Sequence, residues 1–513
     1  MNVLLVSHLI QECNYVGDYY SRWPQLGIAY IASTLERKGH KVRILEKKLL
    51  SGPEYPNSKD QLDKVDRLMF EAMEDFKPNL IGLTATTPVI MDAYRTAKLI
   101  KSAYPELPIV LGGRHATSEP FYTLEQCPDI DIICRGEGEI TMSELAGGTD
   151  LNKVKGIVFR RGNDLTENPN QPLIENLDTL PYPAWHLLDR DFYFRPNISV
   201  MRGDYMTTAT MMTSRGCPYR CAFCQSPELL DIYSRGYIRY HSAERVIGEI
   251  EYLIAGFGVR GISFNDDMFS LDRRRALDIC NAIVAKGINK TLRFTVNLRS
   301  DIVDSEMLDA LKKAGCIHVV YGSESGSEAT LKRMNKSLSV LKNIEAIQLT
   351  KQRGLTEESN IVIGTPGETE KDFLFTIDFL KKSAPDKIFI SKFYPLPGTQ
   401  FFKQLLEQGI IHKPIDWDEI NSLYVENDDF TFADIKPRRF IALRNKLVRE
   451  VVIIRNSLYV IKRNVFKDPK LATIQIIKML MYLFFCYLPI YLEIKLKRIM
   501  GKISFKLRYI YRR

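Results

Sequence analysis

The sequence lacks several features that would assign it to whole classes of proteins. Its nine cysteines are scattered, unlike the dense framework of a small secreted domain, and this favours a reducing cytoplasmic environment. The N-terminus has no basic segment and no small-residue cleavage site, so it is interpreted as a first strand rather than a signal peptide. An uncharged run at residues 479–492 has 14 residues, fewer than the about 20 needed to span a bilayer. No internal repeat or low-complexity tract is evident.

Positive charge is concentrated at the C-terminal end of the chain. From Lys436 onward there are 20 Lys and Arg but three acidic residues, whereas the net charge of the whole chain is +9. The basic tail indicates an anionic partner surface, for which a membrane fits better than nucleic acid. Pro489 interrupts the uncharged run, so this segment is expected to lie peripherally on the inner face of a membrane. A helix packed on the rest of the protein, with its charges in solvent, is an equally good interpretation.

The first 150 residues alternate short apolar runs with amphipathic segments. The apolar runs expected to form strands are Val3–Ser7, Lys41–Leu45, Leu80–Thr84, Ile109–Leu111 and Ile130–Cys134. Their order predicts a doubly wound, Rossmann-like α/β domain over residues 1–150. Ligands of such domains lie beyond the carboxyl ends of the strands. The small or polar residues expected at those ends are Ser7, Thr84, Thr86, Gly112, Gly113, His115, Gly136 and Glu137.

The remainder of the chain divides into three parts. Residues 151–200 contain Gly162-Asn163-Asp164 and Pro181-Tyr182-Pro183, which favour a hairpin and a linker over a continued sheet. Over residues 201–410 the expected strands are Thr208–Thr213, Gly261–Asn265, Arg293–Asn297, His318–Gly322, Ile361–Gly364 and Lys387–Ser391. Six such units predict a partial (β/α)6 barrel with its site at the strand C-termini. Residues 411–513 are expected to form a basic, mainly helical region.

Three closely spaced cysteines follow the first of these barrel strands. Cys217, Cys221 and Cys224 lie in the segment Ser-Arg-Gly-Cys-Pro-Tyr-Arg-Cys-Ala-Phe-Cys. Three thiolates with this spacing can bind one cubane cluster and leave its fourth iron without a protein ligand. That iron can chelate S-adenosylmethionine (SAM) and deliver the electron that cleaves it to a 5′-deoxyadenosyl radical. A zinc knuckle is disfavoured because no fourth Cys or His stands nearby to complete a tetrahedral site.

The cysteine segment resembles that of the radical SAM superfamily, in which an aromatic residue such as Phe223 precedes the last cysteine. The resemblance implies a [4Fe–4S] cluster on the three cysteines, bound SAM, and a reductant such as flavodoxin or ferredoxin. The residues that it implies as SAM contacts are Phe223, Asp266, Asp267, Arg299, Ser323, Glu324, Gly364 and Pro366. For the two aspartates a helix N-cap is the alternative interpretation, and for Arg299 a surface position.

The first 150 residues look like the cobalamin-binding domain that precedes the barrel in many enzymes of this superfamily. The resemblance rests on residues 27–46, 112–117 and 135–139. The Asp-x-His-x-x-Gly signature that supplies an axial histidine in other cobalamin proteins is absent, because His8 and His115 lack that spacing. Cobalamin is therefore expected to bind base-off, without a protein imidazole on cobalt.

Three functions remain open from the sequence. The first is a cobalamin-dependent methyltransferase that acts through the 5′-deoxyadenosyl radical on an unactivated carbon of an apolar small molecule, such as a lipid or a tetrapyrrole. The second is an oxidative cyclase or another enzyme forming carbon–carbon bonds, similar to the anaerobic magnesium-protoporphyrin monomethyl ester cyclases. The third is a cobalamin or redox sensor without catalytic activity. The intact cysteine triad disfavours the sensor, whereas the motifs do not separate the first two.

Overall fold

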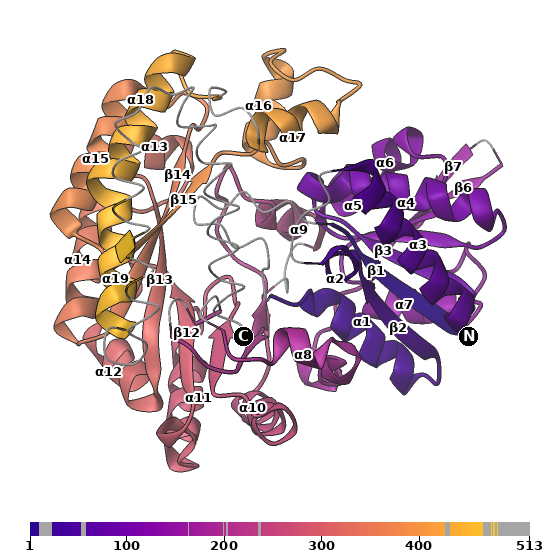
Figure 1. The fold of residues 1–513 in the computed structure, drawn as a ribbon, viewed down its shortest axis with the longest axis horizontal. Coiled ribbons are helices and arrows are strands. Elements are labelled where there is room, and N and C mark those ends of the chain that lie inside the picture. Colours follow the sequence, from indigo (N-terminus) through magenta and orange to yellow (C-terminus); the bar gives the residue numbers. More distant parts are fainter. Residues whose placement is uncertain are drawn as a thin grey trace.

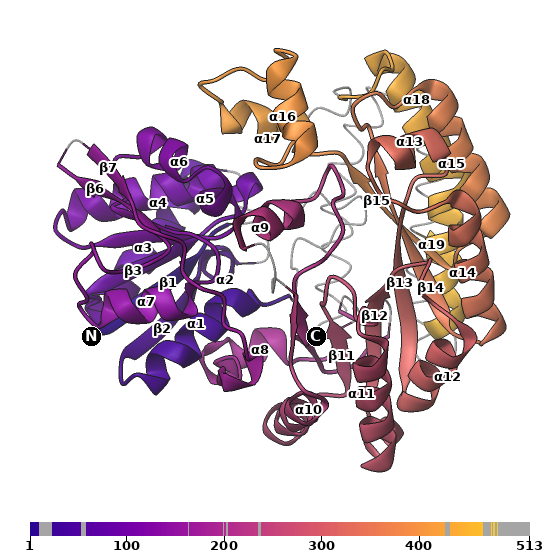
Figure 2. The same ribbon diagram turned by 180° about the vertical axis from the view of Figure 1, so that it is seen from behind.

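The computed structural model describes residues 1–9, 23–52, 58–162, 164–197, 200–201, 204–233, 238–425 and 431–464, and a few residues between 473 and 480. The chain forms two lobes that lie side by side, an N-terminal sheet domain and a half-barrel (Figure 1). Helix α9 (Ser226–Tyr233) lies between them in both this view and the view from behind (Figure 2).

The N-terminal lobe is built on a seven-stranded sheet with the order β2-β1-β3-β4-β5-β6-β7. Its parallel strands are β1 (Asn2–Ser7), β2 (Lys41–Glu46), β3 (Leu80–Thr84), β4 (Ile109–Gly112) and β5 (Ile132–Cys134). Alternate residues of β1 face opposite layers, as the pleat requires. Val3 and Leu5 pack with α1 (Leu26–Arg37) and α7 (Gly138–Ala146). Leu4 and Val6 pack with α3 (Lys59–Phe76) and α4 (Ile90–Ala103). The doubly wound domain is therefore confirmed.

The hairpin expected within residues 151–200 is present, but the expectation that it would leave the sheet is wrong. Strand β6 (Ile157–Arg161) pairs antiparallel with β5, and β7 (Asp164–Glu167) pairs with β6. The turn residues at 162–164 mark the hairpin correctly, whereas the burial of Ile157, Val158 and Phe159 drives the pairing. Only the residues after β7 form the linker, which includes α8 (Arg190–Tyr193).

The second lobe is a six-stranded parallel sheet that curls into a half-barrel (Figure 2). Its order is β15-β14-β13-β12-β11-β8. The strands are β8 (Thr208–Met211), β11 (Gly261–Phe264), β12 (Arg293–Leu298), β13 (Cys316–Glu324), β14 (Thr356–Ile363) and β15 (Lys387–Lys392). Helices α10 (Ala243–Phe257), α11 (Arg273–Ala285), α12 (Ser305–Ala314), α14 (Val340–Gln352) and α15 (Glu370–Ser383) follow strands along the outer face.

The fifth strand of the half-barrel starts five residues earlier than the sequence indicated. The fifth was expected at 361–364, but β14 begins at Thr356. The start was not predicted because Glu357 and Glu358 lie in this part of the strand, and charged residues are rare inside central strands. Glu358 is fully buried and pairs with Lys387 on β15 at 2.9 Å, while burial raises the pKa of Glu357 to about 8.

The concave face of the half-barrel carries a row of polar side chains across four neighbouring strands. Thr210, Ser263, Thr295 and His318 stand in register on successive strands. The alternate residues, such as Ile262 and Phe294, belong to the core shared with the outer helices, so the polar row points to the opposite face. Thr295 Oγ1 donates to Ser263 Oγ at 3.0 Å.

The C-terminal region contacts both lobes. Trp417, at the start of α17 (Trp417–Val425), packs edge-on against His115 and donates from its indole Nε1 to Gln126 Oε1 at 2.9 Å. Further along, α18 (Pro437–Leu447), the π-helical turn Val448–Val452 and α19 (Ile453–Asn464) lie against α15 and β15. The side-chain amide of Asn456 donates to and accepts from the backbone of Ile388, both at 2.8 Å, and so covers the edge of β15.

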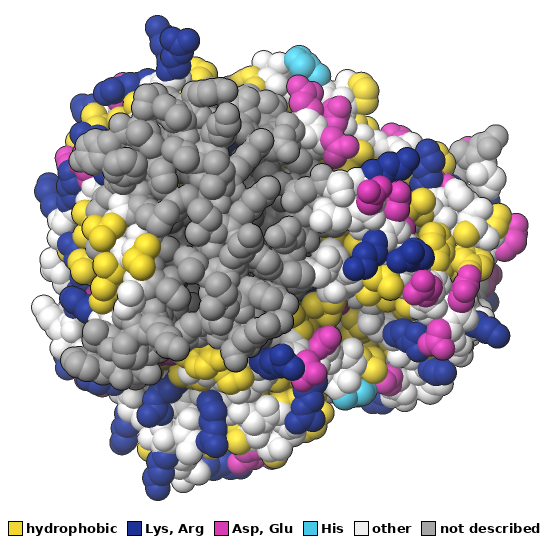
Figure 3. All heavy atoms as spheres, viewed as in Figure 1, with side chains coloured by type: hydrophobic (Ala, Val, Ile, Leu, Met, Phe, Trp, Pro, Cys, Tyr) yellow, Lys and Arg dark blue, Asp and Glu magenta, His cyan; other side chains and the backbone are white. Residues whose placement is uncertain are grey.

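The segment expected at a membrane surface, residues 479–492, lies outside the described residues except for Leu480. Among the helices that the structure describes, none combines the length and apolar character required to cross a bilayer. On the face shown in Figure 3, acidic and basic side chains are interspersed over the N-terminal lobe. This face of the N-terminal lobe therefore does not present a field of one sign.

Candidate active site

The three cysteines lie on one compact loop after the two-residue strand β9 (Ser214–Arg215). Gly216, with φ +100°, turns the chain into this loop, a conformation that L side chains rarely adopt. Cys224 N donates to Cys221 O at 3.1 Å, and Ser226 N approaches Cys224 Sγ at 3.4 Å. Cys221 is buried, whereas the other two thiols are half-buried.

The donor set on this loop fits a cubane cluster. Burial raises the pKa of Cys217 to about 11, and the neighbouring charges of Asp267, Cys224 and Cys221 act in the same direction. Three mutually close soft donors suit iron, and each can bind a different iron of one cluster. In the described part of the chain, no three His, Cys, Asp or Glu side chains gather as ligands of a single metal ion.

Asp266 and Asp267 follow β11 but have different surroundings. Asp266 is fully buried, and its Oδ1 accepts from Thr213 N and Thr213 Oγ1, both at 2.9 Å, and from the Ser214 hydroxyl. It therefore ties the start of the cysteine loop to β11. Its Oδ2 has no hydrogen-bond partner among the described residues. Asp267 is exposed and lies close enough to Cys217 and Arg114 for their charges to interact. Partial desolvation by the neighbouring segments nevertheless raises the pKa of Asp267, and the charge of Arg114 opposes this rise.

Arg299, expected to pair with the carboxylate of SAM, is engaged with the protein. Its Nη2 donates to the carbonyls of Lys336 and Ser337 at 2.6 Å each, and its Nε donates to Asp301 Oδ1 at 2.8 Å. The guanidinium lies over the ring of Tyr219, 3.7 Å from its centroid, inside the cysteine loop. Arg299 thus holds the loop against the end of β12, and it is not a surface residue, with only 5% of its area exposed.

The end of β13 contributes an ion pair beside the cysteine loop. Glu324 has φ +58° and accepts from Lys336 Nζ at 2.8 Å. Lys336 in turn lies 5.9 Å from the ring centroid of Phe223. Ser323 is fully buried, and its carbonyl accepts from the Asn343 amide at 3.2 Å. Of the two residues predicted here, Glu324 faces the cysteine loop and Ser323 faces the protein interior.

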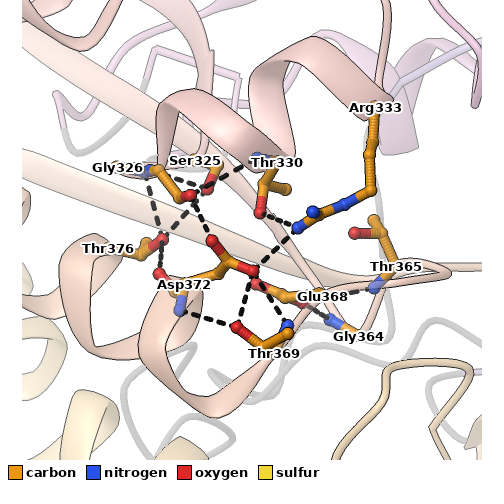
Figure 4. A network of polar contacts seen from close by, with 11 residues as sticks. Ser325, Gly326, Thr330, Arg333, Gly364, Thr365, Glu368, Thr369, Asp372 and Thr376 are labelled. Atoms are coloured by element: carbon orange, nitrogen blue, oxygen red, sulfur yellow. Dashed lines mark hydrogen bonds and ion pairs between the residues drawn. The ribbon is translucent and has the colours of Figure 1, made fainter.

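Polar contacts join the ends of β13 and β14 (Figure 4). Glu368 is fully buried, and its Oε2 accepts from Gly364 N at 2.6 Å and Thr365 N at 3.3 Å. Burial raises the pKa of Glu368 to about 7. Pro366 lies inside this buried turn, which Gly364 begins with φ +81°. A Cβ on Gly364 would meet Thr431 and Phe440 of the C-terminal region, so the turn packs there, and the role of Gly364 and Pro366 as SAM contacts stays a prediction.

The strand ends of the N-terminal sheet carry few bulky side chains. Ser7 is buried with its Oγ unpartnered among the described residues, Thr84 is half-buried and Thr86 is exposed. Gly112 is followed by Gly113, whose φ is +99° and where a Cβ would lie 2.5 Å from Ala85 O. Small side chains at the ligand edge of the sheet and a buried unpartnered hydroxyl fit a broad, flat cofactor such as cobalamin.

The imidazole of His115 is not exposed at this edge of the sheet. It is fully buried beneath Trp417, its Nδ1 is 3.1 Å from Thr87 Oγ1, and burial lowers its pKa to about 3. The residue that covers it comes from the C-terminal region, about 300 positions away in sequence, and no local pattern could reveal it. This placement agrees with a cobalamin bound without a protein imidazole, which stays a prediction.

Gly136 and Glu137 contact the second lobe. A Cβ on Gly136, which has φ +74°, would lie 1.8 Å from the hydroxyl of Tyr233 on α9. Glu137 accepts from Arg215 at 3.0 Å and from Arg239 at 2.7 and 2.9 Å. Although burial opposes it, these arginines lower the pKa of Glu137. The segments that precede and follow the cysteines therefore pack against the loop after β5.

Four residues that were not predicted from the sequence support the cysteine loop: Glu139, Arg215, Arg239 and Lys336. Arg215 donates to Glu139 at 2.6 Å. A signal was available for Arg215, which precedes Gly216 and Cys217, and for Glu139, which follows Glu137 by two residues in the first turn of α7. Arg239 and Lys336 lie in segments without a recognisable pattern.

We expect Gly136→Ala to destabilise the protein more than Gly148→Ala. Both glycines have nearly the same positive φ, +74° and +76°, but nothing lies within 4 Å of a Cβ at Gly148. The backbone strain is thus matched, and the difference reports the clash with Tyr233. The free energy of unfolding, measured by urea denaturation, should be about 1–3 kcal/mol lower for Gly136→Ala than for the control Gly148→Ala. Combining Gly136→Ala with Tyr233→Phe should restore part of this loss. Equal free energies of unfolding for Gly136→Ala and Gly148→Ala would contradict the close contact with Tyr233.

Comparison with known proteins matches each lobe to a protein family. The family model for the radical SAM superfamily matches residues 211–380, and that for the B12 binding domain matches residues 14–146. An uncharacterized methyltransferase of Pyrococcus horikoshii, PH0819, is 33% identical over 392 residues, which cover 76% of this chain and 80% of the relative. The anaerobic magnesium-protoporphyrin IX monomethyl ester cyclase of Cereibacter sphaeroides is 28% identical over 396 residues, 75% of this chain and 61% of the cyclase.

Solved structures show the same fold. The apo form of the cobalamin-dependent SAM radical enzyme OxsB superposes with a TM-score of 0.68 at 18% identity, covering 94% of this chain and 72% of OxsB. The matched regions include both lobes. The chain therefore belongs to the radical SAM superfamily, as a member with an N-terminal B12-binding domain, and its cofactors are a [4Fe–4S] cluster, SAM and cobalamin.

Proposed function

We propose that the chain is a cobalamin-dependent radical SAM methyltransferase that acts on an unactivated carbon of a small molecule. The observation that carries this proposal is the direct contact between the cysteine-bearing segment and the strand ends of the N-terminal sheet, through Tyr233 at Gly136 and Arg215 at Glu137. When bound, the cluster supplies the electron for SAM cleavage and cobalamin supplies the methyl group. Because these loops are in contact, a cofactor bound at each of them could act on the same substrate carbon.

The residues around the cysteine loop would orient SAM and limit the access of water. Asp267 and Glu324 provide carboxylates beside the loop, and Glu368 holds the backbone of Gly364 and Thr365 in one conformation. Buried ion pairs between the lobes cover one flank of the loop. A site that excludes water protects a radical from side reactions.

We propose an amphipathic small molecule as the substrate, such as a lipid or a tetrapyrrole. An unactivated carbon is apolar by definition, whereas the concave face of the half-barrel carries the row of Thr210, Ser263 and Thr295, in which the buried Thr210 hydroxyl has no partner among the described residues. Such a face favours a substrate that carries polar groups beside its alkyl carbon. The reductant would be a small electron carrier such as flavodoxin or ferredoxin.

An oxidative cyclase is the second candidate. The similarity to the Cereibacter sphaeroides cyclase over 396 residues supports it. The two reactions differ in their products, because methyl transfer consumes SAM both as a methyl donor and as a radical source.

Product analysis separates these functions. The protein, loaded anaerobically with iron, sulfide and cobalamin, is incubated with SAM, a reductant and candidate substrates. Methyl transfer predicts S-adenosylhomocysteine and 5′-deoxyadenosine together, whereas cyclisation predicts the second product without the first. A cluster-loaded protein that cleaves no SAM with any substrate would favour the sensor instead.

For the C-terminal tail we propose peripheral contact with the cytoplasmic face of a membrane. Its 20 Lys and Arg against three acids support attraction to anionic lipid. Sedimentation with vesicles of phosphatidylserine and phosphatidylcholine should exceed that with phosphatidylcholine alone and should decline in high salt. Equal sedimentation with both would instead favour the tail as a helix packed on the protein.

A further inference from the structure

The hairpin that leads into and away from the cysteine loop brings two arginines face to face. Strand β9 pairs antiparallel with β10 (Arg239–Tyr240), and the register places Arg239 directly opposite Arg215. Both side chains are largely buried, with 13% of Arg215 and 7% of Arg239 exposed. Like charges directly opposite in a two-stranded pair are destabilising. A pair of this length has little other stabilisation, so it needs an anion at this position.

The anion comes from the other lobe. Glu137 Oε1 lies 3.0 Å from Arg215 Nη1 and 2.7 Å from Arg239 Nη2, and its Oε2 accepts from Arg239 Nη1 at 2.9 Å. Glu139 accepts a second bond from Arg215 at 2.6 Å. The four side chains together carry no net charge and form a cluster between the lobes, from which Arg239 also donates to the carbonyl of Ile174 at 2.9 Å. Arg215 also lies 5.2 Å from the ring centroid of Tyr30 on α1.

We propose that Glu137 is a positioning residue for the iron–sulfur cluster and not a contact of the corrin ring. By joining Arg215 to Arg239, it completes the β9–β10 pair and sets the direction in which the chain enters the loop two residues before Cys217. The N-terminal lobe thus supplies part of the scaffold of the cluster. This inference goes beyond the proposed methyl transfer and does not depend on it.

The proposal makes an electrostatic prediction with opposite signs for two variants. Glu137→Gln leaves one excess positive charge beside the cluster, and Arg239→Gln leaves one excess negative charge. Net charge near an iron–sulfur cluster sets its reduction potential. The potential should therefore rise in Glu137→Gln and fall in Arg239→Gln, and the double variant should return toward the wild-type value. A merely structural defect would not produce shifts of opposite sign.

The experiment measures three properties of the full-length protein reconstituted anaerobically with iron, sulfide and hydroxocobalamin: iron content, corrinoid content, and the cluster potential by electron paramagnetic resonance titration. The expected result is unchanged corrinoid content with opposite potential shifts, or loss of iron from Glu137→Gln alone and its recovery in the double variant. The matched control is Glu167→Gln on β7, which removes the acidic partner of Arg135 in the same loop and should leave all three readouts unchanged.

Two results would overturn the proposal. Corrinoid loss from Glu137→Gln with an unchanged cluster potential would identify Glu137 as a corrin contact. Unaltered iron, corrinoid and potential in Glu137→Gln would show that the arginine pair does not need its anion. Neither readout involves methyl transfer, so these outcomes are distinct from a failure of the proposed function.

Discussion

Cys221→Ala is expected to lose the iron–sulfur cluster and all SAM cleavage while keeping its cobalamin. Cys221 is the middle cysteine of the loop and its most buried thiol. A cluster with only two cysteine ligands on this loop has lost one of its three anchors. Iron should fall from about four per chain to near zero. Corrinoid content should be unchanged, because the cobalamin edge belongs to the other lobe.

The matched control for this prediction is Cys280→Ala. Cys280 is also a buried barrel cysteine, but it lies on α11 in the hydrophobic core. Removing its sulfur should cost some packing energy and leave both the cluster and SAM cleavage in place. Anaerobic iron and corrinoid assays, with 5′-deoxyadenosine measured after reduction with dithionite, provide the readouts. SAM cleavage by Cys221→Ala would refute the assignment of the cysteine triad.

Asp92→Asn is expected to destabilise the N-terminal lobe by about 3–5 kcal/mol. Lys47 is fully buried, and its ammonium donates to Asp92 Oδ1 at 2.6 Å and to Thr96 Oγ1 at 2.8 Å. The other carboxylate oxygen accepts from Leu9 N at 3.0 Å and lies 3.2 Å from the His8 ring. Removing the charge of Asp92 therefore leaves a buried cation without its counter-ion. Urea denaturation followed by circular dichroism measures the loss.

The pH for this measurement follows from the sign of the shift. Although burial opposes it, the hydrogen bond from His8 and the charge of Lys47 hold the pKa of Asp92 below its ordinary value. A depressed pKa of a carboxyl contributes stability that is fully present above the unfolded pKa of about 4 and is lost as the pH falls further. The difference between wild type and Asp92→Asn should thus be complete at pH 7 and shrink in strong acid.

Two further variants test the cause of the loss. Asp75→Asn breaks the exposed pair with Arg43, in which 72% of Asp75 is accessible, and should cost less than about 1 kcal/mol. The double variant Lys47→Met with Asp92→Asn removes the stranded cation and should recover much of the stability. If the single and double variants were equally unstable, the unpaired charge of Lys47 would not be the cause.

The loop after β5 illustrates what could not be read from the sequence. Glu137 was expected at the cobalamin edge because it follows a strand of a doubly wound sheet, and it does lie at that strand end. Its partners are Arg215 and Arg239 of the other lobe, far away in sequence. Strand periodicity locates the ends of strands, but it carries no information about which lobe packs against them.

The two aspartates after β11 show the same limit at close range. Asp266 and Asp267 are adjacent and chemically identical, and both were predicted as SAM contacts. The structure directs one to the backbone of Thr213 and leaves the other exposed near Cys217. Alternation between faces holds within a strand but is lost where the strand ends, so only the folded backbone distinguishes them.

By itself, the sequence determined which three thiols lie together as the predicted ligands of the cluster, and the order of the two lobes. Cys217, Cys221 and Cys224 lie within eight residues, and a short loop brings such neighbours together whatever the rest of the chain does. The tertiary structure decided which strand-end residues are buried and which tie the lobes together. His115 beneath Trp417 and Glu137 between two arginines depend on contacts between distant segments. Those contacts form only when both lobes bury their apolar surfaces and the polar groups left between them must pair.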